Sequence, residues 1–169
     1  FYPEEVARAA LDIGLRAAVG IIVVEFPSPY GSGAAEYIRK GLETRDQLRD
    51  ESRISFTLAP HAPYTVSDDS FRRVASLAAE LGMPVQCHVH ETLTEISDSL
   101  AQHGKRPLHR LADLGLLGPD FIAIHAVHLD DSDLALLASQ GAAVAHCPHS
   151  NLKLASGIAP TARLRALGV

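Results

Sequence analysis

This chain of 169 residues has few cysteines, few basic residues and no long apolar runs. Disulfide-rich, nucleic-acid-binding and membrane proteins depend on these features. It has no tryptophan and only two cysteines, Cys87 and Cys147, each inside an apolar run. Two such cysteines exclude a scaffold held together by disulfides and favour buried thiols in a reducing compartment. We therefore expect a cytoplasmic protein.

Basic residues and long apolar runs are also scarce. Lys and Arg total 15 against 20 for Asp and Glu, the formal net charge is -5, and no basic run occurs. This balance argues against nucleic acid as a partner. The apolar stretches, such as Gly20–Val24, are far shorter than the roughly 18 residues of a membrane span, so we expect no membrane partner either.

Methionine occurs once, at Met83, and the chain begins at Phe1. Its last residues, Leu167–Val169, are typical of a helix end that leads toward a further strand. We therefore expect the chain to be a piece of a longer protein. Its length and its 47% hydrophobic residues are nevertheless sufficient for one globular domain.

Strand-like and helix-like segments alternate along the whole chain. A helix is expected from Pro3, with apolar Val6, Ala10, Ile13 and Ala17 at helical spacing. Short apolar or β-branched runs predict five strands, at Gly20–Phe26, Ile54–Ala59, Pro84–His88, Phe121–His125 and Ala142–His146. Helical patterns lie between them, at about Ala34–Asp50, Asp68–Leu81, Thr94–Leu114 and Ser132–Gln140. This alternation predicts an α/β fold with a parallel sheet.

Four of the predicted strands carry a histidine at or just past their carboxyl end: His61, His88, His125 and His146. A single histidine in this position is more often a satisfied polar residue than a ligand. Four in register are different, because (β/α)₈ barrels carry their active sites at the carboxyl ends of the strands. The pattern therefore predicts that at least two of these histidines serve one site.

Imidazole is a common ligand of zinc, iron and nickel, and His88 is the best ligand candidate on these grounds. On a strand, however, His88 and His90 would both point inward, and the residues alone leave the choice between them open. Glu91 follows closely and suits a proton shuttle beside water whose pKa a metal has lowered. The alternative for Glu91 is an acid at the N-terminus of the next helix.

Motifs in the second half of the chain resemble those of the amidohydrolase superfamily. The similarity is to the branch that contains 5-methylthioadenosine/S-adenosylhomocysteine deaminases and the related chlorohydrolases. The segments that carry the resemblance are Ala59–Tyr64, Cys87–Thr92, Ile124–Leu129, His146–Leu154 and Gly157–Pro160.

The resemblance implies a partial (β/α)₈ TIM barrel, with residues 1–169 as its central part, truncated at both ends, and with parallel strands about three to seven of eight. It makes His88 a metal ligand and Glu91 the acid/base carboxylate that contacts the substrate ring. It makes His125 a catalytic residue and His61 a substrate-binding residue. All four are expected at one end of the sheet, around one divalent metal ion, zinc or alternatively iron.

The function that the resemblance implies for the full-length protein is hydrolytic deamination of the adenine ring of 5-methylthioadenosine or S-adenosylhomocysteine. Metal-bound hydroxide would attack, with Glu91 as the proton shuttle. The substrate would thus be a small purine nucleoside, and homo-oligomerisation stays open. The family also places an H-x-H pair on its first strand and an aspartate on its eighth, so we expect the isolated 169 residues to be inactive.

Two alternatives to this function remain at the level of the sequence. The same machinery could act on guanine or on a chlorinated triazine ring, since only the substrate pocket separates these reactions. The second alternative is that the protein is not an enzyme but a metal-free barrel used for binding.

Overall fold

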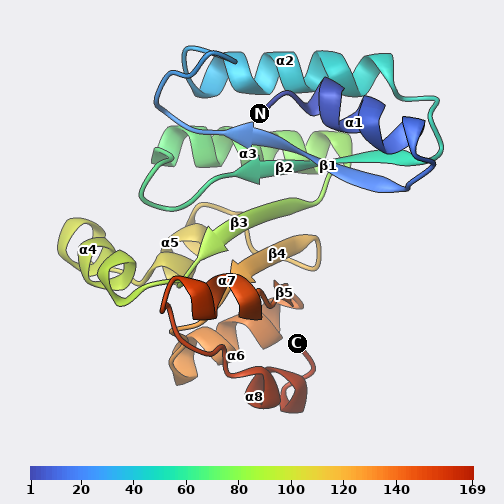
Figure 1. Ribbon diagram of the computed structural model, residues 1–169. Coiled ribbons are helices and arrows are strands. Elements are labelled where there is room, and N and C mark those ends of the chain that lie inside the picture. Colours follow the sequence, from blue (N-terminus) through green and yellow to red (C-terminus); the bar gives the residue numbers. More distant parts are fainter. The chain divides into compact units, whose positions relative to one another are not determined.

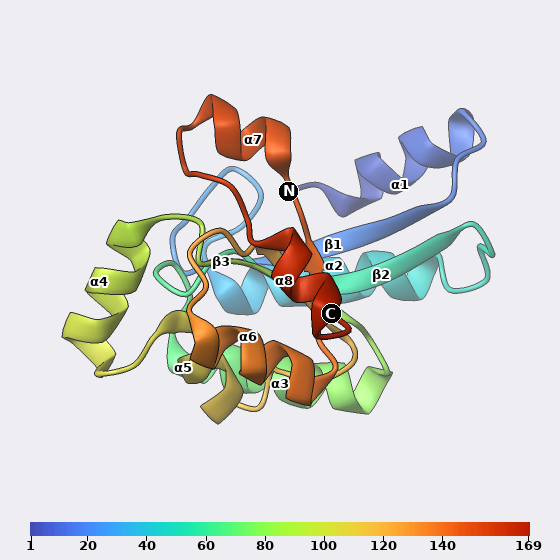
Figure 2. The same cartoon turned by 90° about the horizontal axis from the view of Figure 1, so that it is seen from below.

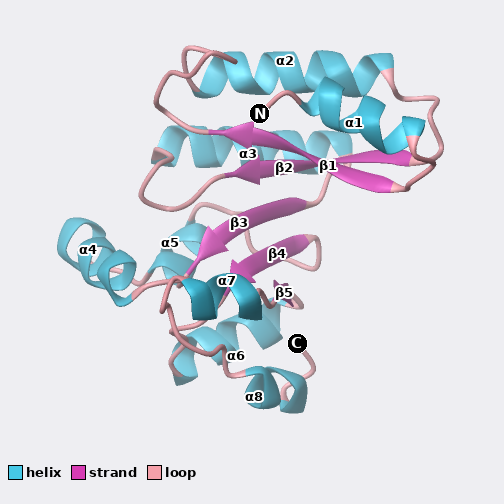
Figure 3. Cartoon of the chain, in the orientation of Figure 1, coloured by secondary structure: helices cyan, strands magenta, loops and turns pink.

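The structure, a computed structural model, describes residues Phe1–Val169, and the chain divides into two compact units. Unit 1 comprises Phe1–His61 and Thr65–Val85, and unit 2 comprises Ala62–Tyr64 and Gln86–Val169. Five strands hydrogen-bond in chain order (Figure 3). They are β1 (Ala17–Val23), β2 (Ile54–Pro60), β3 (Val85–Val89), β4 (Phe121–His125) and β5 (Ala143–Ala145).

Unit 1 is built around the parallel pair of β1 and β2, whose register runs from Ala17 opposite Ile54 to Val23 opposite Pro60. Helices α1 and α2 both pack on β1, and α3 packs on β2 (Figure 1). A Cβ atom at Gly41 of α2 would lie 2.2 Å from Ile21, so only glycine permits this close approach of helix to strand. The helices are α1 (Pro3–Asp12), α2 (Ala34–Gln47) and α3 (Asp68–Leu81).

Unit 2 contains β4 and β5, which pair in parallel with Ile122 opposite Ala143. Helix α5 packs against α4 and α6, and α6 also packs against α8 (Figure 2). Its helices are α4 (Leu93–His103), α5 (Pro107–Asp113), α6 (Asp131–Gln140), α7 (Pro148–Lys153) and α8 (Thr161–Ala166). Its largest fully buried apolar side chains are Leu108, Leu111, Phe121, Leu134 and Leu137. None of the helices in residues 1–169 has the length and apolar character needed to cross a membrane.

The N-terminal helix differs from its prediction. It ends at Asp12, because Gly14 adopts a positive φ of 77° and the amide of Leu15 bonds back to Ala10. Strand β1 therefore begins at Ala17, three residues before the predicted start. Of the predicted apolar face only Ala10 is buried in this helix, since Val6 is 50% and Ile13 72% exposed. The helix buries Pro3 and Ala7 in their place.

The segment predicted as one helix at Thr94–Leu114 is two helices. Gly104 takes the left-handed conformation and its amide caps Leu100, and Pro107 then starts α5 at a position where its missing N–H costs nothing. Strand β5 is also shorter than predicted and ends at Ala145. The exposed His146 follows it, and helix α7, which the sequence did not predict, begins at Pro148.

Candidate functional site

The ends of β3 and β4 bring two of the predicted histidines together in unit 2. The ring centroids of His88 and His125 lie 5.4 Å apart at an interplanar angle of 31°. Along β3 the burial alternates as expected, with Val85, Cys87 and Val89 buried and His88 half-buried. Burial raises the pKa of the Cys87 thiol well above its usual value, which fits the predicted buried thiol, whereas Cys147 is only half-buried.

Glu91 contacts one member of this pair, His125. Its Oε2 atom lies 3.6 Å from His125 Nε2, and its side chain is 19% exposed. Glu91 does not belong to the first turn of α4, because Thr92 is the N-cap residue and Glu95 is the first-turn acid. The alternative helix-terminus role for Glu91 is therefore filled by Glu95. A carboxylate beside an imidazole can accept, hold and pass on a proton.

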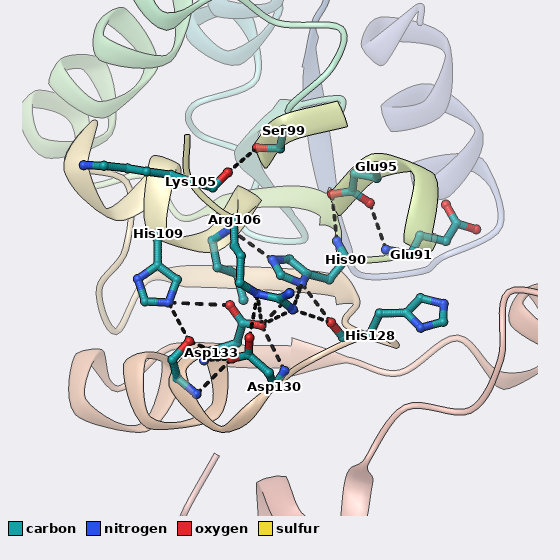
Figure 4. Close-up of polar contacts among 12 residues, drawn as sticks. His90, Glu91, Glu95, Ser99, Lys105, Arg106, His109, His128, Asp130 and Asp133 are labelled. Carbon is teal, nitrogen blue, oxygen red and sulfur yellow. Dashed lines mark hydrogen bonds and ion pairs between the residues drawn. The ribbon is translucent and has the colours of Figure 1, made fainter. Parts of the chain in front are cut away.

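Glu95 fixes the backbone of Glu91 and of the residue before it. Its Oε1 accepts the amide of His90 at 2.8 Å, and its Oε2 accepts the amide of Glu91 at 2.9 Å (Figure 4). Burial raises the pKa of the Glu95 carboxyl, and hydrogen bonds from the backbone work against that rise. The sequence signal for this role is the capping-box spacing of Thr92 and Glu95.

The backbone takes up uncommon conformations where β3 and β4 end. His90, His125 and Ala126 have positive φ angles of 57°, 75° and 46°. Such angles are costly for residues other than glycine and gather at functional sites. Hydrogen bonds from Ala126 N to Val89 O at 3.1 Å and from His128 N to His90 O at 3.0 Å hold the two strand ends together.

His90 serves the fold. It is fully buried, its Nε2 accepts the amide of Leu108 at 3.2 Å, and its Nδ1 lies 3.1 Å from the carbonyl oxygen of His128 (Figure 4). These contacts require the neutral ring with its proton on Nδ1. Burial lowers the pKa of His90 and so keeps the ring neutral, although the negative charge of Asp133 works in the opposite direction. With both ring nitrogens engaged, His90 has no atom left for a metal ion.

A buried ion pair lies beside His90. Arg106 Nε and Nη2 lie 2.9 and 2.6 Å from Asp133 Oδ2, and Nη2 also donates to the carbonyl of His128 at 2.8 Å (Figure 4). Asp133 is wholly buried, while the Arg106 side chain keeps 21% of its exposure. Since the same carbonyl also faces His90, the pair fixes the loop that follows β4.

Asp130 caps helix α6 in a reciprocal capping box with Asp133. Burial alone would raise the pKa of Asp130, but hydrogen bonds from Ser132 and Asp133 and the charge of Arg106 outweigh it and lower the pKa to about 2. Because the folded-state pKa lies below the ordinary 3.8, this group contributes stability above that pH and loses it as the pH falls toward about 2.

We therefore expect Asp130→Asn to destabilise the protein at neutral pH by an amount that shrinks toward zero as the pH falls from 3.8 to about 2. Asparagine preserves the capping oxygen, so the variant removes the charge and keeps the cap. Urea unfolding of both proteins across this pH range measures the difference. Asp120→Asn, at an exposed turn position, is the control. A difference that stayed constant with pH would show that the charge of Asp130 plays no part.

His61 belongs to unit 1, so its predicted place beside the other three residues stays a prediction. Its amide donates to Val23 O at 3.0 Å, and its Nδ1 lies 2.9 Å from Thr65 Oγ1, which anchors the residue just past β2. His146 and His149 are both exposed next to and within α7.

Sequence reasoning gave no role to one further residue of this site. Asn151, on α7, places its Oδ1 atom 2.7 Å from His125 Nδ1, and both side chains are buried. No local pattern marks this contact, because the helix that carries Asn151 was itself not predicted.

The donor set suits a divalent metal ion in kind. Imidazole from His88 is a ligand that zinc accepts, and the carboxylate of Glu91 can move a proton to or from zinc-bound water. A catalytic zinc site usually has about three protein ligands. Within residues 1–169 no group of three or more His, Cys, Asp or Glu side chains is arranged to hold a metal. These residues therefore fit one side of a metal site.

Residues 2–169 match the amidohydrolase family. The chain is similar to 5-methylthioadenosine/S-adenosylhomocysteine deaminases from Saccharophagus degradans, with 50% identity over 98% of this chain and 37% of the relative, and from Teredinibacter turnerae, with 47% identity over 100% and 38%.

Among solved structures, an adenosine deaminase from Xanthomonas campestris with bound zinc matches at 46% identity and a TM-score of 0.97, over 100% of this chain and 38% of that one. This likeness confirms the predicted fold class, a parallel α/β portion of a (β/α)₈ barrel. The chain spans about 38% of the length of the relatives that it matches. It belongs to the amidohydrolase family.

Proposed function

We propose that the full-length protein removes the amino group from the adenine ring of 5-methylthioadenosine or S-adenosylhomocysteine by hydrolysis, and that residues 1–169 are the central part of its barrel. The observation that carries the proposal is the contact of the Glu91 carboxylate with His125 Nε2 beside His88, where β3 and β4 end. The names of the relatives at 47–50% identity support this substrate class.

In this reaction the oxygen of water bonds to the ring carbon that bears the amino group, and the carbon–nitrogen bond then breaks. The products are ammonia and the corresponding 6-oxo purine. Glu91 takes a proton from the attacking water and delivers it to the adjacent ring nitrogen. It then passes the second proton of the same water to the amino group, which leaves as ammonia. His125 Nε2 accepts a hydrogen bond from the attacking water and so polarises it.

We propose His88 as the protein ligand that this chain contributes to a zinc ion. Zinc, when bound, lowers the pKa of water toward 7 and so supplies a nucleophile at neutral pH. The half-buried position of His88 and its place beside His125 support this assignment. His61 is proposed as a contact to the substrate, and the two free cysteines support a reducing, cytoplasmic location.

The test is a substrate panel with the zinc-loaded full-length protein, in which ammonia release is measured. The panel contains 5-methylthioadenosine, S-adenosylhomocysteine, 5'-deoxyadenosine, adenosine, guanine and a chlorotriazine, the last assayed by chloride release. We expect kcat/KM to be highest for an adenine nucleoside with a modified 5' position. Preference for guanine or the triazine would replace the proposed substrate, and inactivity on every compound with zinc bound would overturn the proposed function.

A further inference from the structure

Helix α7 buries a single side chain, and that side chain is polar. Asn151 is wholly buried, while its apolar neighbours Leu152 and Leu154 are each 65% exposed. Burying an amide costs free energy unless its polar atoms find partners. Asn151 Oδ1 has one, at 2.7 Å on His125, but its Nδ2 atom is buried without a hydrogen-bond partner. A side chain chosen only for stability would be apolar here.

The contact decides which nitrogen of His125 carries the proton. An amide oxygen only accepts hydrogen bonds, so His125 Nδ1 donates to Asn151, and in the neutral ring Nε2 then keeps its lone pair. Nε2 is the atom that lies 3.6 Å from Glu91 Oε2. The opposite tautomer would place a proton on the nitrogen that faces the reacting groups. His125 also has a positive φ of 75°, so the ring is fixed both by its backbone and by Asn151.

We propose that Asn151 is a positioning residue, which holds His125 as the Nδ1–H tautomer and keeps Nε2 unprotonated toward Glu91. This inference rests on the proposed function for its kinetic consequence, although the tautomer itself does not depend on the reaction. Asn151 acts through His125 alone, as the third group of a catalytic triad acts through its histidine.

The kinetic test uses Asn151→Leu, a change of similar size that removes the acceptor, in the full-length protein. We expect kcat to fall about a hundredfold, in the range that general acid–base groups contribute, with KM and bound zinc nearly unchanged. In a His125→Gln background the same substitution should cause no further loss, because the residue on which Asn151 acts is gone. Leu152→Ala, at an exposed position of the same helix, should leave kcat unchanged. Additive losses, or a parallel loss of zinc, would overturn the proposal.

The second test needs no activity. In protein labelled with ¹⁵N-histidine, the ring signals of His125 are assigned by their absence from His125→Gln. We expect a protonated Nδ1 and an unprotonated Nε2, and a shift toward Nε2–H in Asn151→Leu. An unprotonated Nδ1 in the unsubstituted protein, or signals that Asn151→Leu leaves unchanged, would refute the role of Asn151. Failure of the whole substrate panel with the expected signals present would refute only the proposed function.

Discussion

Glu91→Gln in the full-length protein should lower kcat by at least about a hundredfold and leave bound zinc near the unsubstituted level. Glutamine preserves the shape of the side chain and removes its ability to carry a proton, and proton transfer by a positioned side chain contributes about 10²–10⁴-fold in rate. The backbone of Glu91 is held by Glu95, so the substitution should not move the loop. Steady-state kinetics together with metal analysis of the same preparation measure both quantities.

Asp98→Asn, at an exposed position of α4, is the matched control for Glu91→Gln, because it removes one negative charge nearby without touching His125. It should leave kcat within about twofold, since removing a single exposed charge changes little in the local energetics. Full deaminase activity in Glu91→Gln would mean that the carboxylate has only a structural role.

Asp133→Ala should lower the free energy of unfolding by about 3 kcal/mol, because it leaves the guanidinium of Arg106 without its buried partner. The value lies at the low end for buried pairs, since Arg106 retains 21% of its exposure and can reach water. The substitution also removes the Asp133 carboxylate that completes the capping box with Asp130. Urea unfolding of the full-length protein measures the loss.

The control for Asp133→Ala is Asp131→Ala, a substitution on the same turn of α6. It breaks the exposed ion pair of Asp131 with Arg163 of α8. Pairs of this kind contribute about 0.2–1 kcal/mol. If the two substitutions cost the same, the pair of Arg106 with Asp133 would contribute no more than a surface contact.

Part of the fold followed directly from the sequence. Strand β4 and helix α3 have the predicted bounds, because a short β-branched run and a helix with a serine N-cap and a glycine C-cap each contain their own end signals. The neighbourhood of His88 and His125 followed from one rule, that parallel strands end at the same edge of a sheet. The helical spacing that placed Ile13 on the apolar face failed because it ran past the helix end at Asp12.

The different surroundings of His88 and His90 could not be predicted from periodicity. Alternation places both on one face for as long as the strand continues. In the structure β3 ends at Val89 and His90 turns into the left-handed region, so the rule no longer applies to it. The partners of His90 are Leu108 and His128, which are distant in sequence. The role of Asn151 could not be predicted for the same reason, since its partner, His125, is 26 residues away in the sequence.

The measurement that tests the central claim most directly is the zinc content of His88→Ala and His90→Ala in the full-length protein. In His88→Ala, bound zinc should fall well below one ion per molecule while the thermal midpoint stays close to that of unsubstituted protein with its metal removed. In His90→Ala, the folded fraction should retain about one ion per molecule but unfold at a lower temperature, because a buried hydrogen-bond network is broken. Retention of zinc by folded His88→Ala together with its loss from folded His90→Ala would contradict the assignment of the site.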